Sequence, residues 1–237
     1  LPAYYEAIDG KSGKSLFDAV QKVTKTGYSS LGYDGLWAAY KYTDLYDNGY
    51  VWDMYSDCTW KSINSNHCGN YSDECDCYNR EHSIPKSWYG GTTSGPGCDI
   101  FHLVPTDGKV NGIRSNYPFG EVGSADYNKH GNKRGSAKSI TITGGNTIAG
   151  NTGTTVSASG TVFEPRDEYK GDFARGYMGA LLKWAGDKAF TDGEGSKTFT
   201  TNFSTGSFGL TKYGVALLMK WHRQDPVSQK EIDRNNG

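Results

Sequence analysis

Three consecutive residues, Arg80, Glu81 and His82, set a cation, a carboxylate and an imidazole side by side in the stretch CYNREHSIPKSW, residues 77–88. A carboxylate oxygen can bind a hard cation, and a neutral histidine can take a proton from water near neutral pH. Residues 79–85 have the pattern of a short strand that stops at a proline. The pair is a candidate catalytic site. Taken alone, it is more often a solvated carboxylate beside a packed histidine.

A second stretch, CDIFHLVPTDGKVNGIRSNYPFGEV (residues 98–122), holds partners for such chemistry. Residues 98–105 predict another short strand, and Thr106 is a plausible cap for a following helix. That helix would carry Asn111 and Arg114 on adjacent faces. Amide and carboxylate oxygens suit Mg²⁺, and an arginine fork can hold a phosphate. These are the groups that hydrolysis of a phosphodiester needs.

Four ordered motifs resemble one family. They are NREHSIPKSW, the stretch 98–122, FEPRDEYKGDFAR (163–175) and KWHRQDPVSQKEIDRNN (220–236). In this order they are similar to the endonuclease I family of secreted and periplasmic nucleases, which belong to the His-Me finger (ββα-metal) nucleases. The resemblance covers roughly residues 30–236.

The resemblance implies a role for each matching residue. His82 would be the general base, and Glu81 and Asn111 would hold one Mg²⁺, for which Ca²⁺ or Mn²⁺ could substitute. Arg114 would contact the phosphate, or else pair with Asp107 or Glu121. Asn116 is a rival for the ligand role of Asn111.

Two further residues are expected near the substrate. Arg80 lies next to the site and could steer the nucleic-acid backbone, or it could be an ordinary surface cation. His102 sits where family members more often have two histidines, but its neighbour here is Phe101. A structural or supporting role for His102 therefore stands beside substrate binding.

The resemblance also implies an α+β fold. We expect a single mixed domain over residues 1–237, with a ββα-metal core at about 77–120 and a Gly/Thr-rich β excursion at about 131–160. The implied activity is metal-dependent, sequence-nonspecific cleavage of DNA, with RNA as a further substrate, to 5′-phosphate and 3′-hydroxyl ends. A secreted or periplasmic monomer is expected.

Composition narrows the class of protein. No apolar run approaches the roughly 18 residues of a membrane span, so no membrane association is expected. The net charge of −1 lacks the cationic excess of many nucleic-acid binders, so any phosphate-binding surface must be local. The segment KHGNKRGSAK, residues 129–138, is a candidate for that surface, and a solvated loop is the alternative.

Five cysteines cluster between residues 58 and 98, a spacing typical of disulfides that clamp an irregular region. Cys68 and Cys77 are the predicted pair because they bracket the loop that enters NREH, and other pairings stay open. The odd number leaves one cysteine over. A zinc site with His67 is the competing reading, which the absence of a CxxC pair disfavours.

Periodicity predicts the remaining elements. Helices are expected at 13–25, 34–42, 167–186 and 211–226, and a strand at 48–57. One more helix should begin after Ser228, with Glu231 completing a capping box. Residues 163–175 are acidic enough for a second site, but a helix entry with a charge network, including a buried Arg175, is the preferred interpretation.

Two other functions remain open at this level. A metal-independent ribonuclease would use paired histidines and the RNA 2′-hydroxyl. A non-enzymatic polysaccharide-binding module would use the 17 tyrosines and 6 tryptophans. Neither accounts for the four ordered motifs.

Overall fold

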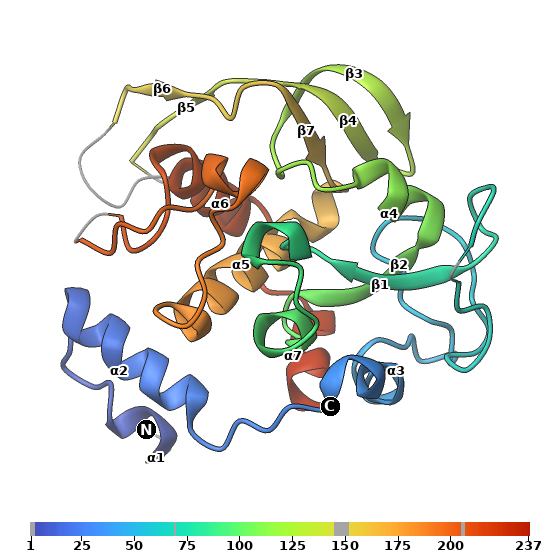
Figure 1. Ribbon diagram of the computed structural model, residues 1–237, viewed down its shortest axis with the longest axis horizontal. Coiled ribbons are helices and arrows are strands. Elements are labelled where there is room, and N and C mark those ends of the chain that lie inside the picture. The colour runs from blue at the N-terminus through green and yellow to red at the C-terminus, as the bar shows by residue number, and fades with distance from the viewer. Residues whose placement is uncertain (1–2, 69, 145–151, 205–206) are drawn as a thin grey trace.

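The fold is α+β, as expected, in a computed structural model that describes residues 3–68, 70–144, 152–204 and 207–237 (Figure 1). The helices are α1 Ala3–Glu6, α2 Gly13–Lys25, α3 Gly32–Thr43, α4 Gly108–Arg114, α5 Lys170–Trp184, α6 Lys212–Gln224 and α7 Gln229–Asn236. The strands are β1 Tyr78–His82, β2 Leu103–Asp107, β3 Val122–Lys129, β4 Asn132–Ala137, β5 Ile140–Thr141, β6 Thr155–Val156 and β7 Thr161–Glu164.

The two strands predicted around NREH and FHLVP form an antiparallel ladder. Glu81 pairs with Val104, and His82 pairs with Leu103. α4 begins directly after β2, so β1, β2 and α4 follow one another as strand, strand and helix. In Figure 1, α4 lies on one side of this ladder, and α3 and α7 lie on the other. The ladder is therefore covered by helices on both faces.

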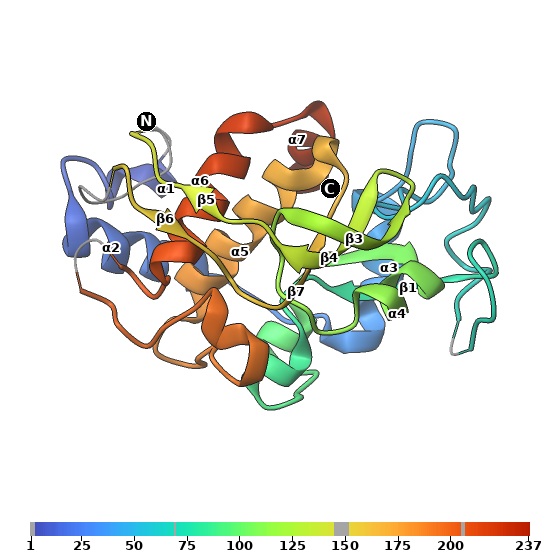
Figure 2. The same ribbon diagram turned by 90° about the horizontal axis from the view of Figure 1, so that it is seen from above.

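A second sheet has the order β3-β4-β7 and is antiparallel throughout. β5 and β6 form a separate short ladder, which extends from this sheet over α6 (Figure 2). The predicted β excursion at about 131–160 therefore contains β4, β5 and β6. Residues 145–151 of that prediction lie outside the described residues.

Most of the predicted helices are present. α2 has the predicted bounds, and α3 begins two residues earlier than expected. The predicted helix at 167–186 starts with a 3₁₀ turn, Asp167–Tyr169, and continues as α5. The capping box that opens α7 is confirmed, with Ser228 and Glu231 bonded to each other's backbone.

Two local predictions are wrong. Residues 48–57 form no strand but only an isolated bridge between Leu45 and Val51, and Met54 and Tyr55 are buried in the core. Their apolar pattern reflects insertion into the core, not a ladder. The cap of α4 is Asp107, whose carboxylate accepts from Val110 N, not Thr106.

The main core lies between α5, α6 and the inner faces of the sheets, with Phe119, Tyr177 and Trp221 among its largest members. A smaller cluster packs α3 against the β1–β2 ladder through Leu36, Tyr78 and other apolar residues. Within the described chain, none of the helices is both long enough and apolar enough to cross a bilayer.

Candidate active site

β1 presents the predicted site residues on two opposite faces, as the alternation of a strand requires. Asn79 and Glu81 face α4, where they meet Asn111 and Arg114. His82 faces the other way, toward α3, and the ring of Tyr33 stacks on it at a centroid distance of 5.5 Å. Glu81 and Asn111 therefore share one interface, and His82 lies at the end of the same strand.

Glu81 is enclosed, with 2% of its surface exposed. Its Oε1 accepts hydrogen bonds from Arg114 Nη1 at 2.8 Å and from the Tyr55 hydroxyl at 3.0 Å. Burial raises the pKa of Glu81 to about 7, even though Arg114 and Tyr55 both favour the charged form. Among the described residues no hydrogen bond engages Oε2, so one carboxylate oxygen retains its capacity as a ligand.

Asn111 orients its amide through a neighbour on β1. Its Nδ2 donates to Asn79 Oδ1 at 2.6 Å, which leaves the Asn111 Oδ1 as an acceptor. The rival ligand, Asn116, lies beyond the end of α4 and is exposed. The geometry therefore favours Asn111 over Asn116 as the partner of Glu81.

These oxygens fit a hard divalent cation. The carboxylate of Glu81 and the amide oxygen of Asn111 come from packed neighbouring elements and are both hard donors. The raised pKa of Glu81 shows that Arg114 only partly offsets the burial of its charge, so a second positive charge would be stabilising there.

His82 is nearly enclosed, with 8% of its surface exposed, and its Nε2 lies 3.1 Å from the carbonyl oxygen of Gly97. Burial and the neighbouring His102, whose ring centroid is 6.3 Å away, lower the pKa of His82 to about 3. The imidazole is therefore neutral at neutral pH and able to accept a proton.

Arg114 is 1% exposed and acts inside the protein. Besides Glu81, its guanidinium contacts the carbonyl oxygens of His82 at 2.9 Å and Ser83 at 2.5 Å. These contacts hold the C-terminal end of β1 in place. The expected phosphate contact stays a prediction that this enclosed geometry does not favour.

Arg80 and His102 are also occupied. The Arg80 guanidinium lies 3.5 Å from the centre of the Tyr33 ring and donates to the Tyr33 carbonyl, so it anchors α3 to β1. His102 is fully buried, with Nε2 2.6 Å from the carbonyl oxygen of Pro96. For both residues the structure shows supporting contacts, and substrate binding stays a prediction.

Two disulfides clamp the loop that enters β1. Cys68 pairs with Cys77, and Cys58 pairs with Cys75, while Cys98 is a free, buried thiol. These bonds occupy the sulfurs that a zinc site would need. His67 stacks on the Trp37 ring instead, at a centroid distance of 3.8 Å.

The basic segment 129–138 is largely neutralised by neighbouring acids. Its ion pairs are Lys129 and His130 with Glu74, His130 with Asp57, Lys133 with Glu164, and Arg134 with Asp126. A free phosphate-binding surface is therefore not evident there. In residues 163–175 the expected charge network is present, because a partly buried Arg175 pairs with Glu231 of α7.

Sequence reasoning missed three supporting residues. Tyr55 donates to Glu81, Asn79 orients Asn111, and the Tyr177 hydroxyl donates to the Ser83 carbonyl at 2.5 Å. Asn79 lies inside the NREH motif and could have been found from strand alternation. Tyr55 and Tyr177 reach the site only through the tertiary fold, and no local pattern marks them.

Comparison with known proteins identifies the family of the chain. A family model described as Endonuclease I matches residues 12–237. An extracellular ribonuclease of Bacillus subtilis (strain 168) is 32% identical over 238 residues, covering 98% of this chain and 69% of the relative. An extracellular ribonuclease of Bacillus amyloliquefaciens is 33% identical over 237 residues, with the same two coverages. The chain therefore belongs to the endonuclease I family, and it is a nuclease.

Proposed function

We propose that the protein is a secreted, metal-dependent, sequence-nonspecific endonuclease that hydrolyses DNA and RNA to 5′-phosphate and 3′-hydroxyl ends. The observation that carries the proposal is the β1–α4 interface, where a buried carboxylate with a free oxygen lies with an amide oxygen, and a neutral histidine directly follows that carboxylate at the end of β1. The names of the two relatives support RNA as a substrate and an extracellular location.

Glu81 and Asn111 are the residues that would hold Mg²⁺. When bound, the ion would offset the charge that builds on the phosphate and on the leaving oxygen. Arg114 and Tyr55 keep the Glu81 carboxylate in place by binding its other oxygen. Asn79 does the same for the amide of Asn111.

His82 is the proposed general base. Its imidazole takes a proton from a water molecule, the water oxygen attacks phosphorus, and the bond from phosphorus to the 3′-oxygen breaks. The leaving 3′-oxygen takes a proton from solvent. A phosphate beside the ring would raise the pKa of His82 from its low value, which strengthens the base when substrate is present. Because Tyr33 stacks on His82, substrate access depends on the position of that side chain.

This mechanism does not use the RNA 2′-hydroxyl, because water is the nucleophile. DNA and RNA can therefore share one site. Contacts would be made mainly to phosphates, so binding should weaken as salt increases.

The test is cleavage of supercoiled plasmid DNA and of single-stranded RNA, each with Mg²⁺ and with EDTA. His82→Ala should lower the cleavage rate on both polymers by at least about a hundredfold, as expected for a lost general base. His130→Ala, on the β3–β4 turn, is the matched control and should cleave like the wild type. Equal rates for wild type and His82→Ala would refute the mechanism.

A metal-independent ribonuclease is the second candidate, because the rings of His82 and His102 lie 6.3 Å apart. Its pair of histidines would cleave RNA in EDTA and leave DNA intact. The burial of His102 argues against it, since a second catalytic histidine must reach the substrate. The same experiment separates the two candidates.

A further inference from the structure

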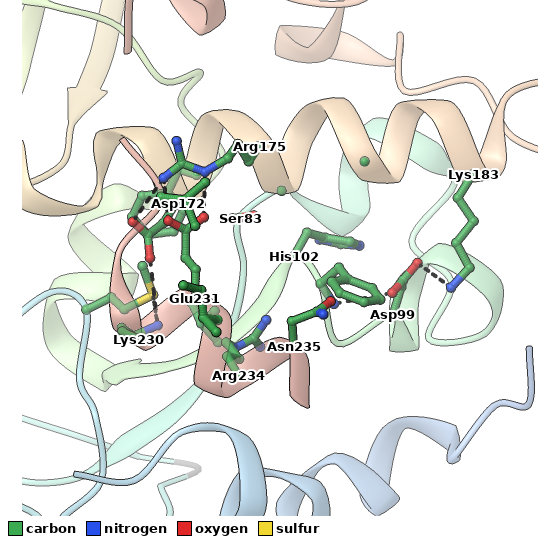
Figure 3. Close-up of a pocket in the computed structure, with 18 of the residues that line it drawn as sticks. Ser83, Asp99, His102, Asp172, Arg175, Lys183, Lys230, Glu231, Arg234 and Asn235 are labelled. Carbon is green, nitrogen blue, oxygen red and sulfur yellow. Dashed lines mark hydrogen bonds and ion pairs between the residues drawn. The ribbon is translucent and has the colours of Figure 1, made fainter. Parts of the chain in front are cut away.

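A cavity of about 510 Å³ lies behind the candidate active site, between α5, α7 and the β1–β2 ladder (Figure 3). Its size is within the range of small-molecule sites. Phe101, Val227 and Ile232 line it and are exposed, so the cavity opens to solvent. Asp172 and Lys230 lie toward one end, and Lys183 and Asp99 toward the other.

Polar atoms without partners gather in this cavity. Four buried atoms have no hydrogen-bond partner among the described residues: Ser83 Oγ, His102 Nδ1 and the two carboxylate oxygens of Asp172. All three residues line the cavity. Buried polar atoms are nearly always hydrogen-bonded, so this concentration points to a ligand or ordered water that satisfies them.

Asp172 is the least satisfied of these groups, with 7% of its side chain exposed. Its nearest cations are Arg175 at 3.7 Å and Lys230 at 3.9 Å, both beyond hydrogen-bond range. Arg175 is engaged by Glu231 and by the Asp225 carbonyl oxygen. Burial, with Glu231 and Asp225 adding to it, raises the pKa of Asp172 to about 6, although Lys230 favours the charged form.

Lys230 also has no oxygen acceptor within hydrogen-bond range among the residues that the structure describes. Its Nζ lies 3.8 Å from the sulfur of Met54 and 5.0 Å from the centre of the Trp52 ring. Asp172 and Lys230 thus form a separated ion pair in which the carboxylate needs donors and the ammonium needs an acceptor. A neutral group that presents an acceptor beside two donors would satisfy both.

Among the nucleic-acid bases, guanine has that edge. Its O6 accepts, and its N1–H and N2–H donate side by side, which matches the two oxygens of a carboxylate. Adenine, cytosine and uracil each lack a pair of adjacent donors on separate nitrogens. The ammonium of Lys230 disfavours a cationic guanidinium at the same place. Met54, Val104 and Phe173 supply apolar walls for a planar ring.

We propose that the cavity is a guanine-binding site, which takes guanosine or a guanine nucleotide through Asp172 and Lys230. The choice of a nucleic-acid base rests on the proposed nuclease function, which would generate such products. Ser83 and His102 line the same cavity and carry buried polar atoms without a hydrogen-bond partner among the described residues. Because Ser83 directly follows His82, a bound ligand would touch the back of the strand that carries the proposed base.

Binding of free nucleosides to the intact protein tests the proposal without any cleavage. Isothermal titration in EDTA should show saturable binding of guanosine. Inosine, which lacks the N2 donors, should bind about tenfold more weakly or worse, since a hydrogen bond to a charged group is lost. Adenosine should not compete with guanosine for the site. Arginine amide, which carries a cationic guanidinium, should not compete either. Absence of guanosine binding, or equal binding of adenosine, would overturn the proposal and leave a water-filled cavity.

Two variants locate the site. Asp172→Asn replaces one acceptor with a donor and should weaken guanosine binding by about tenfold or more, whereas Asp126→Asn, an exposed carboxylate on β3, should leave it unchanged. Lys230→Met should also weaken binding and serves if Asp172→Asn does not fold. Unaltered guanosine affinity in a folded Asp172→Asn or Lys230→Met protein would place the ligand elsewhere. Loss of nuclease activity alone would not affect this result.

Discussion

The β1–α4 interface and the cavity between α5 and α7 each bury a carboxylate, but the two carboxylates differ in their hydrogen-bond partners. Glu81 has Arg114 at 2.8 Å and Tyr55 at 3.0 Å, whereas the nearest cation to Asp172 among the described residues lies at 3.7 Å. Burial nevertheless raises the pKa of both acids, to about 7 and about 6. Burial therefore sets the direction of the shift in either region, and the partners decide how many oxygens remain for a ligand.

The difference also separates a braced region from an open one. Arg114 ties Glu81 to the carbonyl oxygens at the end of β1, and the Cys68–Cys77 disulfide holds the loop at its start. None of the described residues donates a hydrogen bond to the Asp172 carboxylate at the cavity. This contrast is expected for a rigid reaction site next to a binding site whose polar groups still need partners. Substitutions at Arg114 and Asp172 test it.

The largest effect is expected for Arg114→Met. Removing one partner of a buried ion pair leaves an uncompensated charge on Glu81, so stability should fall by about 3–5 kcal/mol. Urea unfolding followed by tryptophan fluorescence measures the loss. Arg134→Met breaks an exposed pair with Asp126 and should cost about 1 kcal/mol or less. Equal losses in the two variants would show that Arg114 does not hold Glu81.

Asp172 should make stability depend on pH. The folded pKa of about 6 lies above the ordinary 3.8, so the folded protein binds this proton more tightly than the unfolded chain does. The resulting stabilisation is complete below about pH 4 and is lost as the pH rises to about 6, by about 3 kcal/mol at most.

Asp172→Asn should flatten the fall in stability between pH 4 and 6, measured by urea unfolding at several pH values. Lys230, Glu231, Asp225 and Arg175 remain in place and keep the rest of the local field. If the variant keeps the full dependence of stability on pH, other buried acids are responsible for that dependence. Glu81 and Asp53 are the first of these, since burial raises their pKa values to about 7 and about 6.

A smaller loss is expected for the disulfide that precedes β1. The double substitution Cys68→Ser and Cys77→Ser opens a loop with a sequence separation of 9 and should reduce stability by about 2–3 kcal/mol. Cys98→Ser, at the free buried thiol, is the control and should lose less. A loss no greater than that of the control would mean that the loop is held by its other contacts.

Much of the fold follows from local patterns. The apolar spacing of residues 13–25 predicts α2 with its observed bounds, and Ser228 with Glu231 predicts the start of α7. The stretches 79–85 and 98–105 locate β1 and β2, although β2 begins at Leu103 and continues through Pro105 to Asp107. The pattern at 48–57 misled, because side chains that insert into a core from an irregular segment can alternate as they do in a strand.

The sequence by itself determined the order of the candidate site: an acid and a histidine on one strand, an asparagine on the next helix, and cysteines before them. Local chemistry suffices for this, because strand alternation, helix spacing and family motifs act over a few residues. Only the tertiary structure decided that Arg114 is enclosed against Glu81 and that Tyr55 reaches the same carboxylate. It also decided that the Asp172 carboxylate has no hydrogen-bond partner within the described part of the chain. Burial and partner geometry depend on elements distant in the chain, and these set the pKa and the free ligand atoms of each acid.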